Sequence, residues 1–371
     1  MTIVAHSHPF VVGVDTHAKT HTYAVIETTS GQLLGCEQFP TSPPGIARAL
    51  GWVGRLTRGE ADTLWSIEGV ATYGARLARA AVDSGYEVVE APRISARSRR
   101  GVGKSDPLDA RAIAAAVLPL DEDRLRHPRA DDGTRQALRV LVTARDQMAV
   151  EKTVNVNALT ALLRTNDLGI DARKPLTFAQ IGQASRWQKR NEPLAIAAAR
   201  GEAVRLARRI VDLQHALTEN HARLTELIVA SPAAPLLEET GVGAYTAAVV
   251  ISAWSHPGRV RNEAAFASLA GVNPIPASSG NTSRHRLNRG GDRRLNKALH
   301  YIAITRMSRD PGTKAYLEKR IAKGRTRREV RRCIKRYLAR YLARHLYRTL
   351  NRLYDSIPES DSNSTLAPTI G

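Results

Sequence analysis

The sequence predicts an α/β domain with a mixed sheet, followed by a mostly helical second half. Short β-branched and aromatic runs alternate with helix-length segments up to about residue 125. Beyond that point apolar residues recur at intervals of three or four, as on amphipathic helices. A chain of 371 residues is long enough for two or three domains with buried cores. We expect four regions: the α/β domain at residues 1–125, a coiled-coil-like helical arm at 126–232, a mainly helical domain at 233–356 and a disordered tail at 357–371.

The order of elements in the first domain predicts its sheet. We expect strands at about residues 11–15, 23–28, 33–39, 63–67 and 86–90, and helices at 43–56, at 72–83 and from 106 onward. Three meandering strands followed by alternating strands and helices imply a mixed sheet with right-handed crossovers. This is the order of the ribonuclease H type of fold, in which the first and fourth strands are parallel neighbours.

Four acidic residues are expected to converge at one edge of this sheet. Asp15 ends the first strand and Glu68 follows the fourth, and sites in α/β sheets gather beyond the carboxyl ends of the strands. Asp106 and Asp109 begin the helix that follows the last strand, and residues three apart share a helix face. Like charges do not gather without a counterion. We therefore predict that the four carboxylates bind one or two Mg²⁺ ions, as in sites that cut phosphodiesters.

Each carboxylate also has a simpler interpretation. Asp106, with Pro107 behind it and Asp109 in the first turn, is a good helix start with a side-chain cap. Asp15 fits a turn-capping aspartate, and Glu68 fits a solvated strand end. The metal site is favoured because all four acidic residues occur in a chain whose order of strands and helices matches the ribonuclease H type of fold.

The middle of the chain predicts two long amphipathic helices around a more polar stretch at residues 165–192. Apolar residues recur at helical spacing on both sides of that stretch. The arrangement is typical of a helical hairpin. Such a hairpin serves equally well as a plain spacer or as an oligomerisation or RNA-holding arm.

A glycine-containing turn opens the second half. The sequence GVGAYTAAVVISAW, from Gly241 to Trp254, predicts a Gly-x-Gly turn before an apolar helix. It is similar to a helix-hairpin-helix element, in which Gly241 and Gly243 would present backbone N–H groups to a DNA phosphate. A tight helix–helix turn without a ligand explains the same pattern equally well.

A pair of serines lies in a Pro- and Gly-rich loop further on. Ser278 and Ser279 precede Gly280 and are followed at once by several arginines. Composition alone favours a flexible loop that contacts phosphate. The sharper alternative is a nucleophilic serine beside arginines that neutralise the phosphate it attacks.

The basic excess is concentrated in one region. The chain has 55 Lys and Arg against 35 Asp and Glu, and residues 281–350 hold 22 of the former and 4 of the latter. This region therefore carries +18 of the formal net charge of +20. Such a surface indicates a polyanionic partner, most often nucleic acid. Beside the Gly-x-Gly turn, the candidate phosphate-contacting residues are Arg284, Arg286, Arg289, Arg293, Arg294, Lys297, Arg327, Arg328, Arg331 and Arg332.

Cysteine content and hydropathy indicate the cellular compartment in which we expect the protein. Cys36 and Cys333 offer neither a disulfide framework nor a metal knuckle, which fits a reducing cytosol. The first ten residues lack the pattern of a signal peptide, and no apolar run approaches the roughly 18 residues of a membrane span. We expect a cytoplasmic protein with no membrane partner.

The motifs resemble those of a known family. Asp15 in VGVDTHAKTH, Glu68 in SIEGV, and Asp106 and Asp109 in KSDPLDARAIA are similar to the acidic set of the DEDD insertion-sequence transposases. These enzymes have a RuvC-like N-terminal domain. The second half of the chain is similar to that family's C-terminal transposase domain in GVGAYTAAVV, FASLAGVNPIPASSGN and RLNRGGDRRLNKALH. The match spans both ends of the chain and keeps the order of the motifs.

The resemblance implies a particular chemistry. Family members are bacterial site-specific DNA recombinases, guided by a structured bridge RNA that base-pairs with donor and target DNA. A serine of the second domain attacks the DNA backbone and forms a phosphoserine beside Mg²⁺ held by the acidic set. The composite site is shared between protomers, as dimers assemble into a tetramer. Carried over to this chain, the nucleophile is Ser279, with Ser278 as the fallback, and the protein acts at the nucleoid.

Three other functions stay open at this point. A metal-dependent nuclease specific for branched DNA, similar to a Holliday-junction resolvase, would cut with water and leave Ser279 as a loop residue. A basic RNA-binding or architectural protein would use the carboxylates only for capping and solvation. A sugar-kinase-like ATPase shares the strand–Asp–turn–strand start, but the chain lacks an obvious second phosphate loop.

Overall fold

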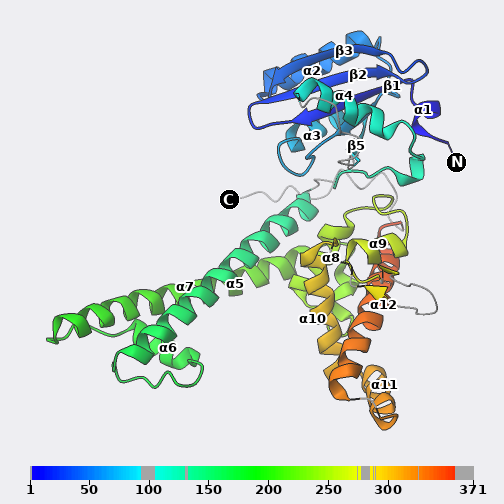
Figure 1. Cartoon of the computed structure of the whole chain (residues 1–371). Coiled ribbons are helices and arrows are strands. Elements are labelled where there is room, and N and C mark those ends of the chain that lie inside the picture. The colour runs from blue at the N-terminus through cyan, green and yellow to red at the C-terminus, as the bar shows by residue number, and fades with distance from the viewer. Residues whose placement is uncertain are drawn as a thin grey trace. The chain divides into compact units, whose positions relative to one another are not determined.

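The computed structural model of the chain describes residues 2–92, 105–129, 133–273, 275–276, 285–286, 288, 290–324 and 326–355. It divides into two compact units, Met1–Ala130 with His256–Ala265 and Asp131–Ser255 with Phe266–Gly371. Figure 1 shows a sheet with helices in the first unit and long helices in the second. The tail predicted at residues 357–371 lies outside the described residues.

The first unit is built on a five-stranded mixed sheet. Its strands are β1 (Phe10–Thr16), β2 (Thr20–Glu27), β3 (Leu33–Pro40), β4 (Leu64–Ile67) and β5 (Glu87–Glu90). They lie in the order β3-β2-β1-β4-β5. Because β1 is antiparallel to β2 and parallel to β4, the predicted ribonuclease H-like sheet is confirmed. The helices of this unit are α1 (Val4–Ser7), α2 (Pro43–Leu56), α3 (Ala75–Asp83) and α4 (Asp106–Val117), with a 3₁₀ turn η1 (Glu122–Arg124).

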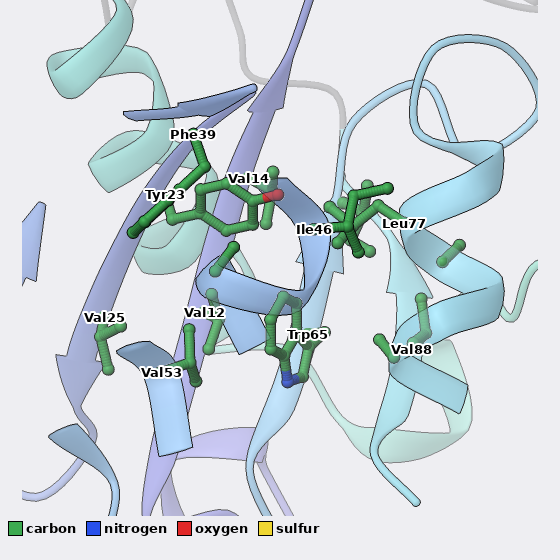
Figure 2. Packing of buried hydrophobic residues seen from close by; sticks show 14 residues of the cluster. Val12, Val14, Tyr23, Val25, Phe39, Ile46, Val53, Trp65, Leu77 and Val88 are labelled. Carbon is green, nitrogen blue, oxygen red and sulfur yellow. The ribbon is translucent and has the colours of Figure 1, made fainter. Parts of the chain in front are cut away.

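Side-chain alternation along the strands gives the sheet two buried faces. On one face, residues of β1, β2, β4 and β5 pack under α2 and α3, and Figure 2 shows Trp65 and Tyr23 among them. On the other face, Val11, Leu64 and Val89 pack against the inner side of α4. Helices therefore cover both faces of the sheet, as the mixed α/β pattern requires.

Local sequence explains where the helices of this unit begin. The Ser42 hydroxyl accepts a hydrogen bond from the Gly45 amide at 3.3 Å, and prolines occupy the first turn of α2. The helix predicted at residues 43–56 is therefore found at those bounds. Helix α3 begins later than the predicted residue 72, because the Thr72 and Gly74 amides both donate to the Gly69 carbonyl in a turn after β4.

The remaining elements are mainly helical. They are α5 (Gly133–Thr165), α6 (Phe178–Ser185), α7 (Leu194–Val229), η2 (Ala234–Glu238), α8 (Ala244–Trp254), α9 (Glu263–Leu269), α10 (Arg293–Arg309), α11 (Pro311–Ala322) and α12 (Arg327–Asp355). Two short strands, β6 (Ile275–Pro276) and β7 (His285–Arg286), form an antiparallel pair.

The predicted long helices form an arm made of α5 and α7, which Figure 1 shows running side by side. Leu159 and Leu163 of α5 pack against Ile210 of α7 in one apolar cluster. The short helix α6 lies in the stretch expected to be merely polar. Its signal was a capping box, in which Thr177 and Gln180 each bond the other's main chain.

The apolar helix α8 lies at the centre of the second unit. It is buried on almost all sides and packs against α10 and α12. The Trp254 indole N–H donates to Asn351 Oδ1 at 2.7 Å, so the end of α8 is attached to α12. The guanidinium of Arg135 donates to the Ser255 carbonyl and lies 5.7 Å from the centre of the Tyr354 ring, which attaches α5 at the same place.

Candidate active site

Strand β1 carries Asp15 toward the sheet face that α4 covers. Successive side chains of a strand point to opposite faces, so Val11, Gly13 and Asp15 share one face. Val11 lies in the cluster that contains Ala114 of α4, which identifies the face. Asp15 is only 7% exposed, so its carboxylate lies at the rim of the packed core rather than in open solvent.

Gly13 allows α4 to lie directly on β1. A Cβ atom at this position would be 2.2 Å from the Ala110 carbonyl oxygen and 2.4 Å from the Ala114 nitrogen, which no side chain can tolerate. The main chain of α4 therefore contacts the main chain of β1 two residues before Asp15. This close packing brings the first turn of α4, with its two aspartates, to the end of the strand.

Asp106 is the first residue of α4 and does not cap it. The N-cap position belongs to Ser105, whose backbone is extended and whose side chain makes no cap hydrogen bond. The predicted side-chain cap at Asp106 is therefore wrong, because the helix already includes this residue. The carboxylate is free to point at neighbouring groups, and Asp106 Oδ1 lies 3.6 Å from His17 Nε2.

His17 joins this cluster, and the sequence interpretation missed it. Its Nε2 lies 3.2 Å from Asp15 Oδ2 as well as 3.6 Å from Asp106 Oδ1. One ligand atom from each of the three residues lies within 4.8 Å of the other two. The signal that could have found His17 is its spacing, because a residue two positions after Asp15 falls on the same face if the strand alternation continues.

The electrostatics show that Asp109 belongs to the same neighbourhood. Burial raises the pKa of Asp15, and the carboxylates of Asp109 and Asp106 raise it further, while His17 acts in the opposite direction. Negative charge at this point is thus destabilised when no cation is present. The effects of Asp106 and Asp109 on the pKa of Asp15 are consistent with the predicted convergence of these three carboxylates.

Glu68 lies beside the cluster without joining its three-residue core. Its amide donates to the Val14 carbonyl at 3.0 Å, which continues the β1–β4 pairing one residue past β4. Leu64 of β4 faces α4, so alternation places Glu68 on the same side of the sheet. The residue is exposed, and its carboxylate is not among the three groups that lie within 4.8 Å of one another.

The donor set fits a divalent cation. Carboxylate oxygens and an imidazole nitrogen are standard metal ligands, and the three ligand atoms are close enough to share one ion. The raised pKa of the buried Asp15 carboxyl indicates negative charge that needs compensation. The geometry thus supports a metal site at this edge of the sheet, with Asp15 and Asp106 as its nearest carboxylates.

The Gly-x-Gly turn packs against a helix of the second unit. Gly241 has φ 87°, and a Cβ there would lie 2.9 Å from the Ile302 carbonyl oxygen, so the turn packs closely on α10. The amide of Gly243 donates to Thr246 Oγ1 at 3.0 Å. Just before the turn, Glu239 pairs with Arg306 and His345 at 2.7 Å each, which connects it to α10 and α12.

Two predicted phosphate-contacting residues have protein partners. Arg294 Nε lies 2.7 Å from Asp146 Oδ2, and the other oxygen of Asp146 accepts from the Tyr245 hydroxyl at 2.7 Å. This network joins α10 to α5 and α8. The pKa of Tyr245 is raised, mainly by burial of its hydroxyl and then by the hydrogen bond to Asp146. The Lys297 ammonium lies 5.8 Å from the centre of the Tyr301 ring.

The other predicted residues of the second half are less fully described. Arg293 is the first residue of α10, after the capping Asp292. Ser278, Ser279, Arg284 and Arg289 lie outside the described residues. Described by backbone alone are Arg286, in β7, and the four arginines that begin α12, Arg327, Arg328, Arg331 and Arg332. In the strand pair β6–β7, Ile275 lies opposite Arg286, and both serines lie between these two strands in the sequence.

A ribonuclease H-like sheet with carboxylates at this edge is compatible with the class of enzymes that cut polynucleotides with divalent cations. A family model for the DEDD transposases of the IS110 type, described as a transposase, matches residues 12–166. A second model, described as the transposase IS116/IS110/IS902 family, matches residues 233–318. The chain belongs to the IS110 family of transposases, as the DEDD resemblance of its motifs predicted.

A curated relative agrees with this assignment. The "Insertion element IS110 uncharacterized 43.6 kDa protein" of Streptomyces coelicolor (strain ATCC BAA-471 / A3(2) / M145) is 26% identical over 347 residues. The alignment covers 81% of this chain and 84% of the relative. As a transposase, the protein is an enzyme of DNA cleavage and transfer and binds DNA. Within the described part of the chain, none of the helices combines the length and apolar content needed to cross a membrane.

Proposed function

We propose that this transposase cuts and rejoins DNA through a phosphoserine at Ser279, with Mg²⁺ held by Asp15, Glu68, Asp106 and Asp109. The observation that carries the proposal is the cluster of ligand atoms from β1, the turn after it and α4 at the edge of a ribonuclease H-like sheet. One or two ions at this edge would supply positive charge to the phosphate oxygens as the bond to phosphorus changes.

The residues of the chain have separable roles in this proposal. The Ser279 hydroxyl oxygen forms a bond to phosphorus as the bond from phosphorus to a sugar oxygen breaks, and the serine proton leaves to a base or water. Attack by a sugar oxygen of the second DNA end reverses the step and rejoins the strand.

Nucleic-acid contacts are assigned to the basic second half. We place the phosphate contacts at Gly241 and along the basic residues Arg284, Arg286, Arg289, Arg293, Lys297, Arg327, Arg328, Arg331 and Arg332. The predicted contacts through the Gly243 amide and Arg294 are not kept, because the amide donates to Thr246 Oγ1 and the guanidinium pairs with Asp146. Sequence choice is assigned to a bridge RNA that pairs with both DNA partners, so that the protein reads backbone and shape. The acidic site and the serine are proposed to meet in a composite site within a tetramer of two dimers.

A covalent-adduct assay tests the serine. Purified protein, its element's structured RNA and target DNA in Mg²⁺ should give a protein–DNA adduct, visible as a shifted band after denaturation. Ser279→Ala should still bind both nucleic acids but form no adduct, whereas Ser278→Ala should keep most of it. An adduct of undiminished yield in Ser279→Ala would move the nucleophile elsewhere. Mg²⁺-dependent cleavage without any adduct, indifferent to Ser279→Ala, would favour a water-using nuclease instead.

A further inference from the structure

His17 lies in a turn whose backbone is held by several hydrogen bonds. Its amide donates to the Thr20 carbonyl at 3.1 Å, which closes the β1–β2 hairpin. The next two residues of the turn are held by Thr41, the residue after β3, whose hydroxyl and amide donate to the carbonyls of Ala18 and Lys19. A side chain on such a rigid support has a defined position relative to Asp15.

The 3.2 Å between His17 and Asp15 allows a hydrogen bond, and the distances from His17 to both aspartates are also compatible with a shared ion. A charge-assisted N–H···O bond measures about 2.7–2.9 Å. His17 Nε2 lies 3.2 Å from the Asp15 oxygen and 3.6 Å from the Asp106 oxygen, so both separations are longer. Two ligand atoms about 2.1 Å from one ion lie about 3.0 Å apart in octahedral and about 3.4 Å apart in tetrahedral coordination. The 3.2 Å separation falls within this range, and the 3.6 Å separation lies about 0.2 Å above it.

The identity of the ligand atom bears on the choice of metal. Mg²⁺ prefers an all-oxygen shell and keeps several waters, whereas Mn²⁺ and later transition metals accept an imidazole nitrogen readily. A site with only aspartate and glutamate ligands offers no such nitrogen. A nitrogen ligand would therefore shift selectivity toward Mn²⁺ beyond what the carboxylates provide.

We propose that His17 Nε2 is itself a ligand of the ion held by Asp15 and Asp106, and that it biases the site toward Mn²⁺ over Mg²⁺. This inference rests on the metal site of the proposed function. The competing arrangement is an imidazolium that pairs with the two carboxylates. That arrangement would oppose cation binding, because it would place a positive charge where the ion must sit.

The test uses the full-length protein freed of metal, with Mn²⁺ alone as the probe. Electron spin echo modulation reports directly whether a ¹⁴N nucleus is bound to Mn²⁺. Dissociation constants for Mn²⁺ come from the free-ion signal, and those for Mg²⁺ come from competition. The variant is His17→Gln, whose position is about half exposed, so the fold should tolerate it. His6→Gln, at an exposed histidine of α1, is the matched control.

Direct ligation predicts nitrogen modulation in the wild type and in His6→Gln, and its loss in His17→Gln. It also predicts that His17→Gln weakens Mn²⁺ binding at least about tenfold while Mg²⁺ binding changes by less than about threefold. Tighter binding of both ions in His17→Gln would overturn the inference in favour of the imidazolium. So would absence of modulation in a wild type that binds Mn²⁺ through Asp15. If Asp15→Asn binds Mn²⁺ as the wild type does, the proposed metal site fails as well.

Discussion

The Thr16 hydroxyl donates a hydrogen bond to the main-chain carbonyl of Glu68 at 2.9 Å. Together with the bond from the Glu68 amide to Val14, it joins the ends of β1 and β4 beyond the last ladder pair. Glu68 therefore has a fixed backbone position one strand away from Asp15, although its carboxylate is exposed. Main-chain contacts therefore fix the backbone at the acidic edge of the sheet, and the carboxylates project from that backbone.

Loss of the Thr16 hydroxyl should loosen this edge. We expect Thr16→Val to lower the free energy of unfolding by about 1 kcal/mol, because the bond is exposed and a typical intramolecular hydrogen bond contributes about that much. The rate of Mg²⁺-dependent DNA cleavage should fall by a larger factor than the loss of folded protein accounts for. Urea unfolding and a cleavage assay measure the two effects. Thr16→Ser keeps the hydroxyl and should behave as the wild type in both.

A methyl group at position 13 should separate α4 from the sheet. The Cβ of Gly13→Ala would meet the Ala110 carbonyl oxygen at 2.2 Å, so the helix that carries Asp106 must move. We expect a loss of about 3 kcal/mol in the free energy of unfolding and strongly weakened metal binding. Calorimetry and metal titration measure both.

Gly51→Ala is the matched control for this change. Gly51 lies inside α2, and its Cβ would meet only the flexible Arg55 guanidinium at 3.7 Å. Alanine there should raise stability by about 0.5–1 kcal/mol and leave metal binding unchanged. Equal behaviour of the two alanine variants would contradict the close approach of α4 to β1.

The stability of the metal-free protein should depend on pH through Asp15. Burial and the neighbouring carboxylates of Asp109 and Asp106 raise its pKa above the ordinary value of 3.8. The contribution of Asp15 to stability is therefore complete below about pH 3.8 and is lost as the pH rises through the folded-state pKa. Asp15→Asn cannot ionise, so it should be more stable than the wild type at pH 7, by about 1.4 kcal/mol per unit of raised pKa.

Thermal unfolding with a chelator between pH 4 and pH 8 measures this difference. The advantage of Asp15→Asn should shrink toward the acid end of the range. Added Mg²⁺ should reverse the order at neutral pH, because a ligand at 100 times its dissociation constant stabilises the protein that binds it by about 2.7 kcal/mol. A variant less stable than the chelated wild type at every pH would show that Asp15 is not under charge repulsion.

Sequence alone predicted much of the first unit, because its signals are local. Alternating β-branched runs marked the strands, and Ser42 with two prolines marked the start of α2. The strand order then brought Asp15 near Asp106, since sheet topology follows from few rules. His17 was missed because its meaning depends on where α4 packs. That packing depends on Gly13, whose role appears only when two main chains are in contact.

The second half was predictable in type but not in partners. Helical periodicity gave the α5–α7 arm, yet nothing local shows that Arg294 pairs with Asp146 some 150 positions away. A phosphate-contacting arginine and an arginine that joins helices have the same sequence signature. Asp106 was expected to cap α4, because a helix start one residue earlier cannot be distinguished by sequence.

Mapping of Fe²⁺-dependent backbone cleavage tests the central claim, that carboxylates from β1, from the residue after β4 and from α4 hold one metal centre. Fe²⁺ substituted for Mg²⁺ generates hydroxyl radicals at the site when ascorbate and peroxide are added, and these radicals cut the chain next to the ion. We predict cuts near Asp15, Glu68 and the Asp106–Asp109 turn together, suppressed by excess Mg²⁺ and lost in Asp15→Asn. Cuts near Asp15 and Asp106 without any near Glu68, or a pattern unchanged by Asp15→Asn, would contradict it.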